Sequence, residues 1–341
     1  MKVLFLQSAH YADDDRVWYH QRAALSEAGC EVDVCGKEEL QDEGRLAAIA
    51  DQADDYQVII VDTPRALWAV RKAKHAKLVY DITEWYPALS SLNQIGWRKY
   101  LKAPLMFLAK LWAGFRVDAF VFGEYYKSSL FRLLFPYKSA LTLPYYPDLG
   151  YFTPPVKYQS YFTTCRLLYT GSLTAEKGWW NTIAAIRLTQ HKLPHIHIIL
   201  DVISKEVPHI PNSNIEINHL AYMPFRAFCK RLALYDVFID LRQTDSQNNK
   251  SLPIKLFYYM AYGRPVIYTD MRGIRKGVPE IEQFGFLVAS VSEASNALCS
   301  YLQKPSLYEK HCQKARELSV TKYNWNSIKD GFTGFITSVC D

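Results

Sequence analysis

The sequence predicts an α/β protein with two doubly wound parallel sheets, and three observations lead to this prediction. Short apolar runs alternate with segments of helical periodicity along the whole chain. The 341 residues exceed one typical core and suit two domains of about 150 residues each. Prolines gather between residues 136 and 155, which indicates a domain boundary. We therefore expect an N-terminal domain over residues 1–155 and a C-terminal domain over residues 156–320.

The composition excludes several classes of function. The chain is 49% hydrophobic and 22% charged, which is typical of a globular protein. Its net charge of +6 favours phosphorylated substrates or anionic lipid. No basic run, zinc-ligand spacing or RNA-binding signature supports a nucleic-acid partner. The seven scattered cysteines include no CxxC pair, so neither a disulfide framework nor a metal site is indicated, and we expect a reducing, cytoplasmic location.

The apolar segments are too short for targeting or membrane-spanning sequences. The first run, residues 3–6, is followed directly by Gln7 and indicates a buried strand rather than a signal peptide. The longest apolar block, residues 104–115, is interrupted by Lys110 and falls short of the roughly twenty residues of a membrane span. We therefore expect no transmembrane helix.

The N-terminal domain is expected to open with a strand, a helix and a second strand. The strand at residues 3–7 precedes a helix that begins near Arg16 and stops at Gly29, and the next strand covers residues 32–35. Further strands are expected at 58–61, 78–80 and 117–122, and helices at 45–53, 65–76 and 94–117.

Polar residues follow the apolar strands of this domain. Ligands of doubly wound sheets bind where the strands end, and His10, Asp62 and Asp81 fall at such ends. Asp13 and Asp15 have the spacing of a metal-binding DxD motif, but acidic residues in a loop before a helix commonly serve as helix N-terminal charges. We therefore expect no metal ion. No GxGxxG follows the first strand, so a dinucleotide site is not expected there.

The C-terminal domain is expected to begin with a strand, a glycine turn and a helix over residues 166–186. Gly171 allows close approach of the backbone, and Lys177 with Gly178 opens the helix. The order G-x5-K-G differs from a Walker A loop, so an NTPase is not indicated. A lysine at a helix N-terminus is unfavourable for the helix, and a bound anion explains it. Further strands are expected at 195–202, 215–217 and 236–241, with a helix at 224–234.

Residues 248–270 are expected to form a loop, a helix and a strand. Ser251 is expected to cap the helix and Pro253 to be its first residue, with apolar side chains following at helical spacing. Lys250 and Lys255 stand within a turn of the helix N-terminus, where backbone amides attract anions, so a phosphate can be held here. A surface helix packed on a sheet is the alternative reading. Residues 291–318 are expected to be helical.

Residues 94–117 combine cations with aromatic rings. An amphipathic helix of this kind can lie in a bilayer interface, and residues 97–116 are the candidate for peripheral membrane contact. The alternative is a helix of the N-terminal domain whose lysine stems cover its flank.

Several segments resemble, in order, the retaining glycosyltransferases of family 4, which have the GT-B fold. SLPIKLFYYMAYGRPVI, residues 251–267, is similar to the family's SLPxKLFEYMAxGxPVI segment, and LVYDITEWYP, residues 78–87, is similar to VYDxHExYP. His10, Asp14 and Arg16 match an HxxxDxR opening, and Gly171 to Gly178 match a G-x5-KG turn. Weaker similarities lie at 141–152, 273–289 and 321–339.

The resemblance implies two Rossmann-like domains that face a central cleft, and a terminal helix, residues 321–341, that crosses back to the first domain. It implies metal-independent hexosyl transfer with retention, without a cofactor, from a UDP- or GDP-linked sugar to a saccharide or polyprenyl-linked acceptor in surface polysaccharide assembly. The implied donor-binding residues are Gly171, Ser172, Lys177, Asn249, Lys250, Ser251, Lys255 and Tyr258. The implied catalytic residues are Glu84, Asp81 and His10, and those near the acceptor are Asp14, Arg16 and Thr83.

The sequence departs from the family at four of these positions. Thr83 replaces the histidine beside the anomeric carbon, and a threonine cannot act as a base at neutral pH. Tyr258 replaces the glutamate that grips the ribose, Lys250 replaces an acid, and Ser172 replaces an arginine. A phenol makes fewer hydrogen bonds than a carboxylate accepts. A catalytically impaired GT-B homologue that acts as partner or scaffold of an active glycosyltransferase is therefore the alternative.

Overall fold

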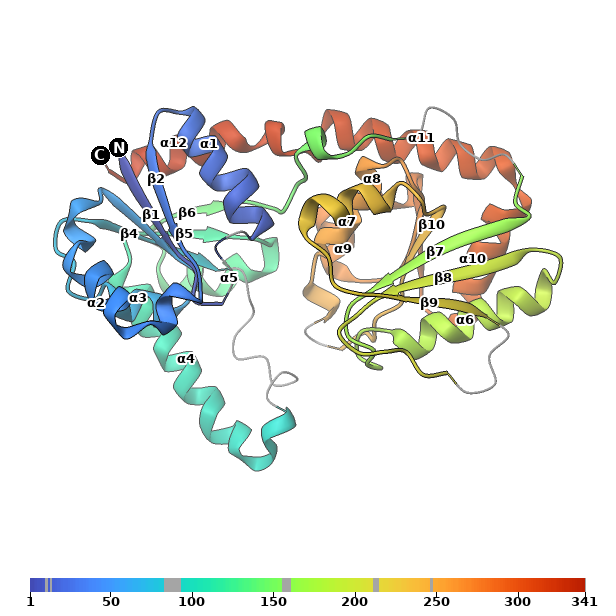
Figure 1. Cartoon of the computed structure of the whole chain (residues 1–341), viewed down its shortest axis with the longest axis horizontal. Helices are drawn as coiled ribbons and strands as arrows, with labels where there is room; N and C mark the ends of the chain where they lie inside the picture. Colours follow the sequence, from blue (N-terminus) through green and yellow to red (C-terminus); the bar gives the residue numbers. More distant parts are fainter. Residues whose placement is uncertain are drawn as a thin grey trace. The chain divides into compact units, whose positions relative to one another are not determined.

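The protein contains two six-stranded parallel sheets with helices packed on them (Figure 1). The structure is a computed structural model, and it describes residues 1–9, 12, 14–82, 93–154, 161–210, 215–245 and 248–340. Two compact units divide the chain: unit 1 is Met1–Tyr145 with Trp325–Asp341, and unit 2 is Tyr146–Asn324. The α/β class with two doubly wound sheets is thereby confirmed.

Unit 1 has the strand order β2-β1-β3-β4-β5-β6, and every neighbouring pair is parallel. The strands are β1 Lys2–Leu6, β2 Glu31–Cys35, β3 Val58–Val61, β4 Lys77–Ile82, β5 Ala119–Phe122 and β6 Ser139–Thr142. The helices are α1 Ala23–Glu27, α2 Glu43–Asp51, α3 Pro64–Ala69, α4 Lys99–Arg116, α5 Tyr125–Leu134 and α12 Lys329–Ser338. A π-helical segment, Asp15–Arg22, leads directly into α1.

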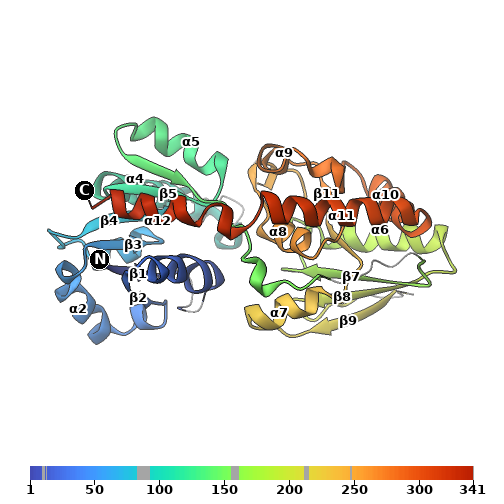
Figure 2. The same cartoon turned by 90° about the horizontal axis from the view of Figure 1, so that it is seen from above.

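The central strands of unit 1 are buried on both faces. Side chains alternate along β1, so Val3 and Phe5 enter one core while Leu4 and Leu6 enter the other. The core around Val3 also contains Phe332 of α12, so the C-terminal helix completes unit 1 (Figure 2). The other core contains residues of α2, α3 and α5.

Unit 2 has the strand order β12-β11-β10-β7-β8-β9, again parallel throughout. The strands are β7 Thr164–Thr170, β8 His197–Ile203, β9 Glu216–Leu220, β10 Val237–Asp240, β11 Val266–Thr269 and β12 Gly285–Val288. The helices are α6 Trp179–Lys192, α7 Phe225–Leu232, α8 Ile254–Ala261, α9 Arg272–Gly277, α10 Val291–Gln303 and α11 Pro305–Thr321.

Unit 2 is closed by large buried side chains. Trp179 of α6 and Tyr301 of α10 belong to one core with residues of β7, β8 and β10. On α8, the ring of Tyr259 stacks on Phe238 of β10, with centroids 3.7 Å apart and an interplanar angle of 2°. α8 is therefore packed directly against the sheet, which fixes the position of its N-terminus.

Several predicted elements differ from the observed ones. The helix predicted at 65–76 ends at Ala69, because the following chain turns and the Asp54 carboxylate accepts hydrogen bonds from the amides of Lys74 and His75. The helix predicted at 291–318 is two helices, since Pro305 cannot continue α10 and instead starts α11. Helix α5 was not predicted. The units divide at Tyr145, ahead of the boundary predicted at residue 155.

Candidate functional site

The topological switch point of unit 2 lies at the carboxyl ends of β7 and β10. From β7 the chain continues to β8 and β9 on one side of the sheet, whereas β10 pairs with the other side of β7 and leads to β11 and β12. Ligands of open parallel sheets bind outside such a point. We use "switch-point site" for the turn 170–178 after β7, the loop 240–242 after β10 and the N-terminus of α8.

Lys255 joins α8 to the end of β7. Its Nζ donates a hydrogen bond of 2.5 Å to the carbonyl oxygen of Thr170. Burial lowers the pKa of Lys255 from its ordinary value of 10.5 to about 8; Arg242 and Lys177 also lower it, whereas Asp240 raises it. A bound anion removes this penalty because opposite charge favours the ammonium form. The shifted pKa, together with the position at a helix N-terminus, makes Lys255 the strongest candidate for a ligand-binding cation.

The turn after β7 is held in one conformation by two contacts. The hydroxyl of Tyr169 donates to the carbonyl oxygens of Ser172, at 2.7 Å, and Lys177, at 3.2 Å. Gly178 has φ +79°, and a Cβ there would lie 2.2 Å from the carbonyl oxygen of Leu241. Only glycine therefore allows α6 to begin so close to the loop after β10. The turn that contains Gly171, Ser172 and Lys177 thus lies beside the loop 240–242, whereas the role of these three residues in binding a donor stays a prediction.

Lys177 itself is partly exposed, with 41% of its side chain accessible, and forms an ion pair with Glu176, at 3.2 Å. Its charge reaches Lys255, since it contributes to the lowered pKa of that residue. The two lysines therefore belong to one electrostatic environment. An ion pair between exposed side chains contributes little, so Lys177 can exchange Glu176 for a ligand phosphate at small cost.

Asp240 and Arg242 form the third part of the site, and the sequence reasoning missed both. The Arg242 guanidinium makes a bidentate ion pair with Asp240, with Nη2 2.8 Å from Oδ2 and Nε 2.9 Å from Oδ1. Burial disfavours the charge of Arg242, but the Asp240 carboxylate outweighs it and raises the pKa of Arg242. The available signal was an acid at a predicted strand end followed two residues later by an arginine.

The predicted cap of α8 is wrong. Pro253, not Ser251, occupies the N-cap position of α8, and no side chain accepts a hydrogen bond from the first amides. The physical reason is that Asn248–Lys250 form a separate 3₁₀ turn, and the Ser251 amide donates to the carbonyl oxygen of Asn248 at 2.9 Å. The chain therefore enters α8 as an extended segment.

Residues 249–251 lie against α9. The Asn249 Oδ1 accepts a hydrogen bond of 3.0 Å from the amide of Arg272, and a Cβ on Gly273 would lie 2.2 Å from the Ser251 carbonyl oxygen and 2.6 Å from that of Lys250. This contact fixes the backbone before α8. The donor-binding roles of Asn249, Lys250 and Ser251 stay predictions.

Tyr258 lies in an aromatic cluster of unit 2. Its ring is buried, with centroids 5.5 Å from Phe152, 5.9 Å from Phe225 and 6.4 Å from Phe228. Aromatic packing accounts for its presence on the apolar stripe of α8. Whether its hydroxyl also binds a donor ribose stays a prediction.

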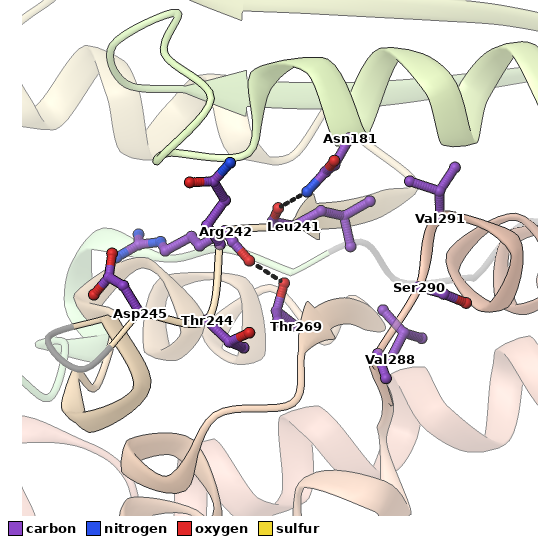
Figure 3. A pocket seen from close by; sticks show the side chains of 11 residues that line it. Asn181, Leu241, Arg242, Thr244, Asp245, Thr269, Val288, Ser290 and Val291 are labelled. Atoms are coloured by element: carbon purple, nitrogen blue, oxygen red, sulfur yellow. Dashed lines mark hydrogen bonds between the residues drawn. The ribbon is translucent and has the colours of Figure 1, made fainter.

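A cavity of about 450 Å³ adjoins the loop after β10 (Figure 3). It is bordered by the strand ends of β11 and β12, and Asn181 of α6 donates a 3.0 Å hydrogen bond to the Leu241 carbonyl oxygen at its edge. Thr269 donates to the Arg242 carbonyl oxygen at 2.9 Å. Both bonds fix the backbone of the loop between the cavity and the switch-point site. The cavity and the switch-point site share the loop after β10, but none of the predicted donor-binding residues is among the described residues that line the cavity.

Unit 1 contains a second polar cluster, at the carboxyl end of β4. Arg16 and Asp81 form an ion pair of 2.6 Å, with side chains only 5% and 2% exposed. Gln21 donates a 3.0 Å hydrogen bond to the same carboxylate oxygen, and the Arg16 guanidinium lies 4.3 Å from the Tyr145 ring centroid. Burial disfavours the charge of Arg16, but Asp81 outweighs it and raises the pKa of Arg16. Within the described residues, no group donates to the other oxygen of Asp81, Oδ1.

The remaining predicted residues of unit 1 have different outcomes. Asp14 caps the first helical segment, accepting from the Arg16 amide at 3.2 Å. Asp62 accepts from the amides of Ser8 and Ala9, so it fixes the loop after β1. His10, Thr83 and Glu84 lie outside the described residues. In the part of the chain that is described, no three His, Cys, Asp or Glu residues are arranged to hold a metal ion.

Comparison with solved structures identifies the fold. No family model and no curated protein matches the sequence. Sucrose-phosphate synthase from Thermosynechococcus elongatus superposes with a TM-score of 0.69 at 14% identity, covering 99% of each chain. Anabaena HepE in complex with UDP-glucose gives 0.66 at 15% identity, over 99% of this chain and 100% of HepE. S. aureus TarM, in complex with UDP, gives 0.61 at 12% identity over 87% of this chain and 58% of TarM. The chain therefore has the GT-B fold.

Proposed function

We propose that the chain is a GT-B glycosyltransferase that transfers a hexosyl group from a nucleotide-sugar to a saccharide or lipid-linked acceptor. The observation that carries the proposal is the cationic switch-point site, in which the partly buried side chains of Lys255 and Lys177 flank a glycine turn at the carboxyl end of β7. Helix N-termini and lysines at such a point suit a diphosphate.

The chemistry follows from the charge that develops on the leaving diphosphate. Lys255 and Lys177 supply positive charge where that negative charge grows. These groups supply the stabilisation that a divalent ion gives in other transferases, which supports metal-independent transfer. Retention of configuration and membership of family 4 are supported by the motif resemblance.

The donor proposed first is a UDP-sugar. HepE is in complex with UDP-glucose and TarM with UDP, and their folds match this chain over most of its length. A GDP-linked sugar is the second choice. The proposed setting is surface polysaccharide assembly on the cytoplasmic side of a membrane.

Unit 1 supplies the proposed acceptor side. Arg16 and Gln21 both hold Oδ2 of Asp81, which leaves Oδ1 to accept a hydrogen bond from a ligand hydroxyl. A buried carboxylate fixed in this way can orient a sugar hydroxyl. His10, Glu84 and Thr83 are proposed to act in the same region.

Tyr258 supports a second candidate function, a GT-B homologue without catalysis that serves as partner or scaffold of an active enzyme. The phenol stands where the family has a carboxylate, and Phe152, Phe225 and Phe228 surround its ring. A thermal-shift screen with UDP, GDP and their sugars distinguishes the two functions. Stabilisation by a nucleotide supports the transferase, and its absence with every nucleotide supports the scaffold.

The experiment that tests catalysis measures release of UDP from UDP-glucose and UDP-N-acetylglucosamine. Lys177→Ala should lower the rate by about two orders of magnitude, which is typical for loss of one electrostatic donor. Lys205→Ala, which removes an exposed lysine beyond the end of β8, is the matched control and should keep the wild-type rate. An unchanged rate in Lys177→Ala contradicts the role assigned to Lys177.

A further inference from the structure

Helix α4 presents an exposed apolar stripe. Five residues, at the alternating spacing of four and three that places them on one helix face, form this stripe: Leu101, Leu105, Leu108, Trp112 and Phe115. Leu101 is 62% exposed, Leu105 65%, Leu108 57% and Phe115 69%. Exposed apolar surface of this extent on one element marks an interaction site.

One face of α4 is buried, and it includes Ala103 and Lys110 as well as the C-terminal part of the helix. Ala113 and Gly114 are buried, and a Cβ on Gly114 would meet the ring of Phe135 at 2.4 Å. Toward Lys99 the helix runs away from the sheet of unit 1 (Figure 1). The three leucines of the stripe are therefore exposed, whereas Trp112, nearer the C-terminal end of the helix, is partly buried against the core of unit 1.

The apolar surface continues from α4 onto α3 and α2. Trp68 of α3 contacts Trp112, with ring centroids 5.5 Å apart, and is itself 56% exposed. Trp68 also lines a hollow of about 440 Å³ between α2 and α3, whose wall is mainly leucine and alanine. Arg71 lies over the Trp68 ring, at 4.5 Å from its centroid, and Arg65 borders the same hollow. The surface therefore combines an apolar centre with a border that carries Arg65, Arg71 and one acid, Glu43.

The charges select the kind of partner. Residues 93–117 contain five lysines and arginines and no aspartate or glutamate. A second copy of this helix would bring these cations close to one another, which is unfavourable. An anionic bilayer attracts the exposed cations among them, Arg98 and Lys102, while the leucines of the stripe enter the interface between headgroups and acyl chains.

We propose that α4, with Trp68 and the hollow beside it, docks unit 1 on an anionic lipid bilayer. The 18-residue helix is about 27 Å long and lies along the interface, with Leu101, Leu105 and Leu108 inserted. This is peripheral contact: among the described helices, none has the length and apolarity needed to span a bilayer. The proposal does not depend on glycosyl transfer, because it concerns a surface outside the switch-point site.

The test is flotation of the full chain with vesicles of phosphatidylcholine alone and of phosphatidylcholine mixed with phosphatidylglycerol. We expect binding to the mixed vesicles and much weaker binding to the neutral ones. Arg98→Gln with Lys102→Gln should weaken binding roughly 25-fold, since each cation near an anionic surface contributes about fivefold. The triple variant Leu101→Ser, Leu105→Ser, Leu108→Ser should weaken it by more than about a hundredfold.

A matched triple variant controls for general loss of exposed apolar side chains. Leu133→Ser, Leu234→Ser and Val320→Ser remove three exposed aliphatic residues from other helices or their ends and should leave vesicle binding unchanged. Circular dichroism should show native folding for both triple variants, because all six residues are exposed. Equal binding to neutral and anionic vesicles, or equal loss in both triple variants, overturns the proposal. The proposal is also overturned if the wild type forms a dimer and does not bind vesicles, while the α4 triple variant is a monomer. That result would assign the stripe to contact with a second copy of the chain.

Discussion

Raising the pH from 7 to 9 should weaken the binding of UDP about tenfold, and Lys255 should be the cause. With a pKa of about 8, Lys255 is charged in about nine-tenths of the free protein at pH 7 and in about one-tenth at pH 9. A bound diphosphate raises this pKa, so the complex holds the proton across the range. Binding therefore takes up a proton, and affinity falls as pH rises through 8. The tenfold change equals about 1.4 kcal/mol.

Isothermal titration calorimetry measures this effect in two ways. The dissociation constant of UDP is determined from pH 7 to 9, and titrations at pH 8 in buffers of different ionisation enthalpy give the uptake of about half a proton. The terminal phosphate of UDP titrates near pH 6 and does not contribute in this window. Lys255 retains some solvent exposure, and screening there makes tenfold the upper value.

Variants assign the effect to one side chain. In Lys255→Met the affinity should be weaker at pH 7 and nearly independent of pH, because the titrating group is gone. Lys205→Met removes an exposed lysine of unit 2 and should keep the wild-type pH profile. A flat profile in the wild type, or an unchanged slope in Lys255→Met, refutes the reasoning.

Three further predictions concern the framework of the two units. Gly178→Ala should lower the free energy of unfolding in urea by about 2 kcal/mol or more, because φ is positive there and the added Cβ would lie 2.2 Å from a carbonyl oxygen. The control Gly334→Ala, in open space on α12, should not lower it. Equal stabilities of the two variants would contradict the close approach at Gly178. Asp81→Asn should cost about 3–5 kcal/mol by leaving Arg16 buried without its counter-charge, and a loss below about 1 kcal/mol argues against a buried pair. Burial lowers the pKa of His311 to about 4, below its unfolded-state pKa near 6.5. The free energy of unfolding therefore falls as the pH is lowered from 6.5 toward 4. From pH 7 to 5 the wild type should lose about 2 kcal/mol more of this free energy than His311→Gln.

The strands were predictable because their apolar runs are continuous. β3, Val58–Val61, agrees with the predicted range, since a strand buried on both faces has four apolar residues in succession. Helix α5, Tyr125–Leu134, was missed because aromatic and serine residues give it weak helix propensity, and Phe131 packs it on the sheet through a contact that is visible only in the fold. The break between α10 and α11 coincides with Pro305, because a proline favours the first turn of a helix and not its interior.

The site was predictable only in part. The glycine turn and the lysines could be proposed as an anion site from the sequence, because a cation at a helix N-terminus is unfavourable unless an anion binds there. The bond between Lys255 and Thr170 joins residues 85 positions apart, and the pair of Asp240 with Arg242 gains its importance from lying beside β7. Such relations depend on strand order, which no local pattern specifies.

The most direct test of the central claim is the structure of the chain crystallised with UDP. The diphosphate should lie against the turn from Gly171 to Gly178, within hydrogen-bond distance of the Nζ of Lys255 or Lys177. A diphosphate bound in the cavity beside Asn181, or elsewhere on the protein, would contradict the assignment of the switch-point site.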